Sequence, residues 1–147
     1  MKFALETGQN ILIHGYEAGY ISITGIDAEH PELKSGVIDE WDGDNHLGLL
    51  KKSISIRTNG DIKVWAPQTF ADFIPAHFVD FANENAEIVI LGTGKQLRFP
   101  SQDCLSALQQ NSVGYEVMDT AAACRTFNVL VAEGRDVILA MLMIEKD

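Results

Sequence analysis

The chain has 147 residues, a formal net charge of −10 and a hydrophobic content of 46%. This length fits one domain with a core of its own, so we expect residues 1–147 to form a single domain. The acidic charge disfavours binding to nucleic acid and to anionic membrane surfaces. No stretch approaches the ~18 apolar residues of a membrane-spanning helix.

The opening residues and the cysteines predict a cytoplasmic protein. The first ten residues lack both the apolar run of a signal peptide and the arginines of a transit peptide. Cys104 and Cys124 do not have CxxC spacing, and no cluster of cysteines and histidines surrounds them. Free, buried thiols fit a reducing compartment.

Alternating apolar and polar residues predict antiparallel hairpins in the first half of the chain. A glycine lies at each end of the first connection, Gly15–Gly19, and the second connection contains Asn59-Gly60, a strong hairpin signal. The expected strand pairs are Asn10–His14 with Tyr20–Thr24, and Ser53–Arg57 with Asp61–Trp65.

The segment Asp27–Asp44, between these hairpins, is strongly acidic. We expect one short strand in it, near Gly36–Glu40, and loop structure around Gly43 and Gly48. Its acidic residues do not fit the spacing of a calcium-binding EF-hand loop. We therefore interpret it as an acidic surface segment.

The second half predicts a β-α-β-α-β unit preceded by a broken helix in Phe70–Asn85, which Pro75 should start. Long apolar runs indicate strands buried on both faces, and the lengths of the connections imply parallel pairing with right-handed crossovers. The expected elements are, in order, the strand Ile88–Leu91, a helix from Ser101 to Asn111, the strand Gly114–Met118, a helix from Thr120 to Glu133 and the strand Val137–Ile144. The expected fold class is therefore α/β with a mixed sheet.

The turn Gly92-Thr93-Gly94-Lys95 follows the first of these strands and is a candidate binding site. Glycines let a backbone approach a ligand closely, and the amides together with the lysine could hold an anion. The turn is not a P-loop, because Gln96 stands where the magnesium-binding hydroxyl is required. A purely structural turn is the alternative interpretation.

The helix that begins at Thr120 offers a second group of candidates. Its first turn has small side chains, so a ligand or another backbone could approach its N-terminal amides, and Cys124 near that end could be activated. Arg125 and Asn128 could add polar contacts. The alternative is that the alanines and Cys124 are core residues.

Glu133 and Arg135 flank Gly134 after this helix and could pair across the loop. The four histidines lack metal-ligand spacing, and no nucleophile motif of the GxSxG type is present. We expect no metal, no cofactor and no marked catalytic set.

Several motifs together resemble one family over about residues 86–142. They are Ile88–Gly94, Gly114–Thr120, Ala123–Leu130 and Glu133–Arg135. The family is a domain-of-unknown-function family that includes mitochondrial NADH dehydrogenase (complex I) assembly factor 3. The resemblance implies a small α/β domain that assists the assembly of a respiratory membrane complex through protein contacts. Without an evident mitochondrial presequence, the chain resembles a bacterial member.

Two functions remain open at this stage. The first is a non-catalytic assembly or interaction factor with protein partners. The alternative is a small-molecule or anion-binding protein, or an enzyme, with its site at the Gly92–Gly94 turn and the N-terminus of the Thr120 helix.

Overall fold

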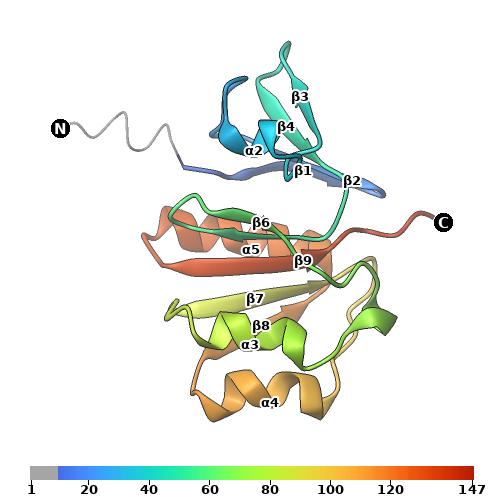
Figure 1. The fold of residues 1–147 in the computed structure, drawn as a ribbon, viewed down its shortest axis with the longest axis vertical. Helices are drawn as coiled ribbons and strands as arrows, with labels where there is room; N and C mark the ends of the chain where they lie inside the picture. The colour runs from blue at the N-terminus through green and yellow to red at the C-terminus, as the bar shows by residue number, and fades with distance from the viewer. Residues whose placement is uncertain (1–9) are drawn as a thin grey trace.

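The computed structural model describes residues 10–147, and their strands form two sheets (Figure 1). The first sheet is entirely antiparallel. Its strands, in spatial order, are β1 (Ile13–Glu17), β2 (Tyr20–Ile23), β4 (Leu47–Leu50) and β3 (Glu40–Asp42). The second sheet is mixed, in the order β6 (Ile62–Val64), β5 (Ile54–Arg57), β9 (Val137–Leu142), β7 (Ile88–Thr93) and β8 (Gly114–Met118). The predicted α/β class is confirmed, with the strands divided between two sheets.

The β-α-β-α-β unit forms as predicted. Strand β7 pairs in parallel with β8 on one side and with β9 on the other. Helix α4 (Gln102–Gln110) connects β7 to β8, and helix α5 (Thr120–Ala132) connects β8 to β9. Both helices begin at a side-chain N-cap: Ser101 accepts from the amide of Cys104, and Asp119 accepts from the amide of Ala122.

The two predicted hairpins belong to different sheets. Strands β5 and β6 form the second hairpin around Gly60, whose φ is +102°. Strand β5 then pairs antiparallel with β9, so that Ile56 lies opposite Leu139. The second hairpin therefore extends the C-terminal unit, and the first hairpin belongs to the separate antiparallel sheet.

The first half also differs from the sequence-based boundaries. The strand β1 runs to Glu17, beyond the expected Asn10–His14, and only Ala18 and Gly19 form the turn. Gly48, expected in a loop, lies inside β4. A Cβ at Gly48 would lie 2.5 Å from the Ile26 side chain, so the glycine is needed for Ile26 to pack closely against the strand. In the sequence, the same glycine indicates a loop.

Two further elements of this half were placed differently or not expected. The short strand expected near Gly36–Glu40 is β3, and it begins at Glu40. Helix α2 (Pro31–Lys34) was not expected; it is a single turn that begins at a proline.

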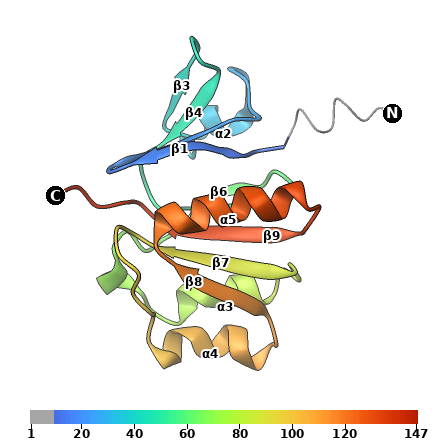
Figure 2. The ribbon, with the colours of Figure 1, turned by 180° about the vertical axis from the view of Figure 1, so that it is seen from behind.

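The mixed sheet is covered on both faces (Figures 1 and 2). Helices α3 (Ala76–Ala82) and α4 cover one face, together with the single 3-10 turn η1 (Phe70–Asp72). Helix α5 lies on the opposite face, and the antiparallel sheet packs beside it. Pro75 is the N-cap of α3, which begins at Ala76, in agreement with the prediction that this proline starts the helix.

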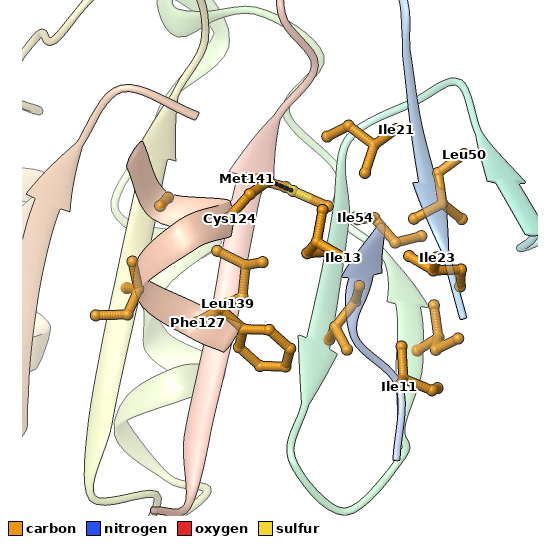
Figure 3. Packing of buried hydrophobic residues seen from close by; sticks show 14 of the residues in the cluster. Ile11, Ile13, Ile21, Ile23, Leu50, Ile54, Cys124, Phe127, Leu139 and Met141 are labelled. Atoms are coloured by element: carbon orange, nitrogen blue, oxygen red, sulfur yellow. Dashed lines mark hydrogen bonds between the residues drawn. The ribbon is translucent and has the colours of Figure 1, made fainter. Parts of the chain in front are cut away.

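The antiparallel sheet shares one hydrophobic core with α5 and the mixed sheet. Ile21, Ile23 and Leu50 are fully buried and point toward the side that carries Phe127 and Met141 (Figure 3). Because this core joins residues far apart in sequence, it fixes the position of the first hairpin relative to α5. Within residues 10–147, no helix is both long and apolar enough to cross a bilayer.

Candidate functional site

The glycine turn after β7 and the N-terminus of α5 are in direct contact. The amide of Gly94 donates to Thr120 Oγ1 at 2.8 Å, and the amide of Thr120 donates to the Gly94 carbonyl at 2.9 Å. The Thr120 hydroxyl in turn donates to the Leu142 carbonyl at 2.7 Å. A Cβ at Gly92 would lie 3.1 Å from Thr120 Cα and 3.0 Å from Met141 Cβ. The small residues here thus let helix and strand approach each other closely.

The loop that follows the glycine turn is held by Thr93 and Arg98. The Thr93 hydroxyl donates to the Gln96 carbonyl at 2.6 Å and accepts from the amide of Arg98 at 3.1 Å. Arg98 Nη2 donates to the Thr93 carbonyl at 2.9 Å, and its guanidinium lies 4.7 Å from the centre of the Phe70 ring. Arg98 was absent from the sequence-based candidates, because a single arginine in a loop carries no motif.

The glycine turn holds an anion, and that anion is the carboxylate of Glu145. The amide of Lys95 donates to Glu145 Oε1 at 2.7 Å, and Arg98 Nη2 donates to Oε2 at 2.8 Å. The ammonium of Lys95 pairs with Asp147. We call Gly94, the Lys95 amide and the Arg98 guanidinium the glycine-turn receptor.

Gly94 is essential to the shape of this receptor. Its φ is +92°, and a Cβ there would lie 2.1 Å from Glu145 Oε1. Partial burial alone would favour the neutral acid, but the Lys95 amide and Arg98 hold the pKa of the Glu145 carboxyl below its usual value. The receptor therefore binds the charged form of a carboxylate.

Arg125 and Asn128 lie away from the glycine turn and connect α5 to the antiparallel sheet. Asn128 Oδ1 accepts from the amide of Ile13 at 2.9 Å, and its Nδ2 donates to the carbonyl of the same residue at 2.8 Å. Arg125 Nη1 donates to the Tyr16 hydroxyl at 2.6 Å. The Asn128 side chain thus binds β1 through its backbone, much as a neighbouring strand would.

Cys124 is fully buried in the core shared by the two sheets (Figure 3). Its Sγ lies 3.8 Å from Met141 Sδ. Burial raises the pKa of the Cys124 thiol to about 12, and nearby Arg125 offsets only part of this effect. The thiol is therefore protonated at neutral pH and has the environment of a core residue.

Glu133 and Arg135 flank Gly134, which has a φ of +79°. Arg135 Nε donates to Glu87 Oε1 at 2.8 Å, and Glu87 Oε2 accepts the amide of Asp136 at 2.9 Å. The cross-loop partner of Arg135 is thus Glu87, in the segment before β7. The ten predicted residues therefore lie in separate places: at the glycine turn, on the buried and sheet-facing sides of α5, and at the opposite end of that helix.

A groove of about 650 Å³ lies on the outer side of the antiparallel sheet and was not predicted. Its lining mixes aromatic, aliphatic and charged side chains. They belong to His14, Gly15, Tyr16, Glu17, Tyr20, Ser22, Asp42, Leu47, Leu49 and Lys51. The alternation of residues in β2 was the sequence feature that could have indicated this face, since it places Tyr20 and Ser22 opposite to Ile21 and Ile23.

The loop of the glycine-turn receptor also carries exposed apolar residues. Leu97 and Phe99, on either side of Arg98, are 53% and 67% exposed. This loop therefore presents two large apolar side chains to solvent. As for metals, residues 10–147 contain no group of three His, Cys, Asp or Glu side chains that could hold an ion.

Comparison with known proteins identifies relatives over most of the chain. The family described as "Protein of unknown function (DUF498/DUF598)" matches residues 13–142. The proteins named "NADH dehydrogenase [ubiquinone] 1 alpha subcomplex assembly factor 3" from Rattus norvegicus and Mus musculus are 43% and 45% identical over 131 residues. Each match covers 88% of this chain, and the chain spans 59% of the length of each relative.

Solved structures show the same fold. A crystal structure of a Bordetella parapertussis protein is 26% identical, with a TM-score of 0.70, and the match covers 91% of this chain and 96% of that one. An NMR structure of a Xanthomonas campestris protein is also 26% identical, with a TM-score of 0.69, and the match covers 97% and 92% of the two chains. The fold described above is therefore shared with proteins that have been solved experimentally.

Proposed function

Because the chain belongs to the DUF498/DUF598 family, we propose that it is a non-catalytic assembly or interaction factor for a respiratory or membrane complex. The observation that carries this proposal is the identity of 43–45% over 131 residues to two proteins named as assembly factors of NADH dehydrogenase. The chain spans 59% of those relatives, so their role is extended here to the shared region. We propose that the protein performs this assembly role in the cytoplasm, a reducing compartment in which its two buried cysteines would stay free.

The hydrogen bonds and the burial of the candidate site residues support a role without catalysis. Thr120 bonds to the glycine turn and to β9, Asn128 bonds to β1, and the Cys124 thiol is buried with a raised pKa. These groups stabilise the fold, whereas the exposed Leu97 and Phe99 are free to contact a partner. We therefore expect the protein to act through its surface.

Depletion of the protein from its native cells tests this function. We expect blue-native electrophoresis to show less fully assembled NADH dehydrogenase and more of its subassemblies, with subunit transcripts unchanged. Re-expression of the wild-type chain should restore the complex, and a second respiratory complex serves as the control. A normal level of assembled NADH dehydrogenase after depletion would contradict the proposal.

Anion binding at the glycine turn is a second candidate, because one observation favours it. The turn already holds a carboxylate, that of Glu145, through the Lys95 amide and Arg98. A protein that recognises acidic groups at this place is compatible with an assembly role, since a protein partner can supply the acidic group.

A further inference from the structure

We propose that the glycine-turn receptor binds an acidic residue of a protein partner in place of Glu145, with Leu97 and Phe99 contacting apolar residues beside that acid. This inference rests on the assembly role proposed above and specifies the chemistry of the partner. The occupant is a segment in which a glutamate or aspartate is flanked by apolar residues.

The chain's own segment 143–147 shows what the receptor accepts. After β9, this segment crosses from the mixed sheet toward the first hairpin, where the amide of Gly19 donates to the Ile144 carbonyl at 2.9 Å. Glu145 then reaches the receptor, and Asp147 pairs with Lys95. The segment therefore acts as an internal ligand of this carboxylate site.

The chemistry of the receptor selects a carboxylate. The Lys95 amide and the Arg98 guanidinium only donate hydrogen bonds, and they contact different oxygens of the same carboxylate. Gly94 lets that carboxylate lie against the backbone, where any larger residue would collide with it. A neutral amide side chain would place one of its own donors against these donors.

The internal contact leaves room for a competitor. Arg98 contacts Glu145 through Nη2, and the Arg98 side chain remains 33% exposed to solvent. A contact at this exposure is weakened by water, so a second carboxylate can compete for it. The Glu145 side chain is 44% exposed, so a partner can approach it from solvent.

The exposed apolar residues give the site its second component. Leu97 and Phe99 are the immediate neighbours of Arg98, and both are more than half exposed. A partner that places its acid on Arg98 brings the residues next to that acid over this loop. Apolar residues there would remove Leu97 and Phe99 from water, which an isolated carboxylate cannot do.

Titration with a defined peptide, followed by NMR, tests the proposal on the full chain. The probe is an acetylated peptide with one glutamate between leucine pairs and a terminal lysine for solubility. We expect Glu145→Ala to bind it about tenfold more tightly than wild type, because a tethered carboxylate competes at an effective concentration of about millimolar. The amide signals of Gly94, Lys95 and Arg98 should shift during the titration.

Matched variants separate the two components of the site. In the Glu145→Ala background, we expect Phe99→Ser to weaken binding and Val129→Ser, a change at a similarly exposed position on α5, to leave it unchanged. Glu133→Ala alone removes one negative charge elsewhere and should behave as wild type. Glu145→Gln provides the same comparison with the original side-chain shape if the alanine variant does not fold.

Three results would overturn the inference. They are equal affinity of wild type and Glu145→Ala, equal affinity of a probe with glutamine in place of glutamate, and shifts confined to residues outside the receptor loop. The peptide titration and the depletion experiment test the two proposals separately. Normal NADH dehydrogenase assembly with specific peptide binding would reject the proposed function alone, and impaired assembly without peptide binding would reject this inference alone.

Discussion

Thr120 joins three segments of the chain through one hydroxyl group. It accepts the amide of Gly94, donates to the carbonyl of Leu142, and begins α5. The residue is fully buried, so neither of these backbone groups can turn to water if the hydroxyl is removed. Thr120 is therefore a stabilising residue at the point where β7, α5 and β9 meet.

We predict that Thr120→Val lowers the free energy of unfolding by about 2–4 kcal/mol, since it leaves a buried donor and a buried acceptor unpaired. Urea unfolding followed by circular dichroism measures this change. The control is Thr126→Val on the same helix, whose hydroxyl contacts only Met118 Sδ and whose loss should cost about 0.5 kcal/mol or less. Similar losses in the two variants would contradict the role given to Thr120.

Cys124 provides a test of the burial of α5. With its pKa raised to about 12, only about one thiol in ten thousand is ionised at pH 8, and the group is fully enclosed. We predict that a thiol reagent such as DTNB labels the native protein far more slowly than the urea-unfolded protein. Cys104 is also buried, so both thiols should be protected together. Rapid labelling of the native chain would show that α5 is more accessible than the structure indicates.

At the scale of elements, the antiparallel sheet is attached to the rest of the molecule through α5. Apolar contacts in the shared core supply most of the attachment, and Asn128 supplies its polar part by bonding to both backbone groups of Ile13. The pairing of β1 with β2 shifts register between Ile13 and Gly15, next to this contact. Asn128 thus replaces pairing that the irregular strand would otherwise lack.

We predict that Asn128→Ala lowers the free energy of unfolding by about 1–3 kcal/mol, because two part-buried backbone groups lose their partner. Hydrogen exchange at the Ile13 amide should accelerate at the same time, whereas amides of β7 should keep their protection. Asn111→Ala is the matched control, since that side chain is exposed and bonds only within the end of α4. The idea is rejected if exchange at Ile13 is unchanged.

Local signals placed the helices of the second half and the strands β2, β5 and β6 well, but they misplaced β1 and missed β4. Helices α4 and α5 begin close to the expected residues, because the caps that start them, Ser101 and Asp119, depend on a few consecutive residues. Strand β4 was missed because Gly48 is typical of a loop, and its actual role is to let Ile26 pack over the sheet. That role depends on Ile26, which lies far from Gly48 in the sequence.

At the scale of the whole molecule, the net charge is −10, and several of the carboxylates that contribute to it form specific hydrogen bonds and ion pairs. Arg57 hydrogen-bonds Asp136 and lowers its pKa, and the amide of Asp136 together with Arg135 lowers the pKa of Glu87. The pKa of Glu145 is also lowered. Carboxyl groups with depressed pKa values bind protons more weakly in the folded state than in the unfolded state.

The sign of this linkage predicts loss of stability in acid. The contribution of these groups is present above the pKa values of the unfolded chain, about 4, and is lost as the pH falls through the lower folded values. We expect the free energy of unfolding to stay level from pH 7 to about 5 and to fall steeply below about 4. Urea unfolding across this range measures it. Asp136→Asn should be less stable at pH 7, and its free energy of unfolding should fall less steeply in acid. An equally steep fall would show that Asp136 does not contribute to the acid sensitivity.

The sequence by itself determined the α/β class, the positions of α4 and α5 and the order of elements in the C-terminal unit, since each of these depends on neighbouring residues. Only the tertiary structure decided that β5 pairs with β9, that Asn128 binds β1 and that Glu145 lies on the glycine turn. These contacts join residues 50 or more positions apart, so no local pattern records them. The candidate site changed for the same reason: the glycine turn was visible in the sequence, but the carboxylate bound beside it belongs to Glu145, 50 positions beyond Lys95 in the chain.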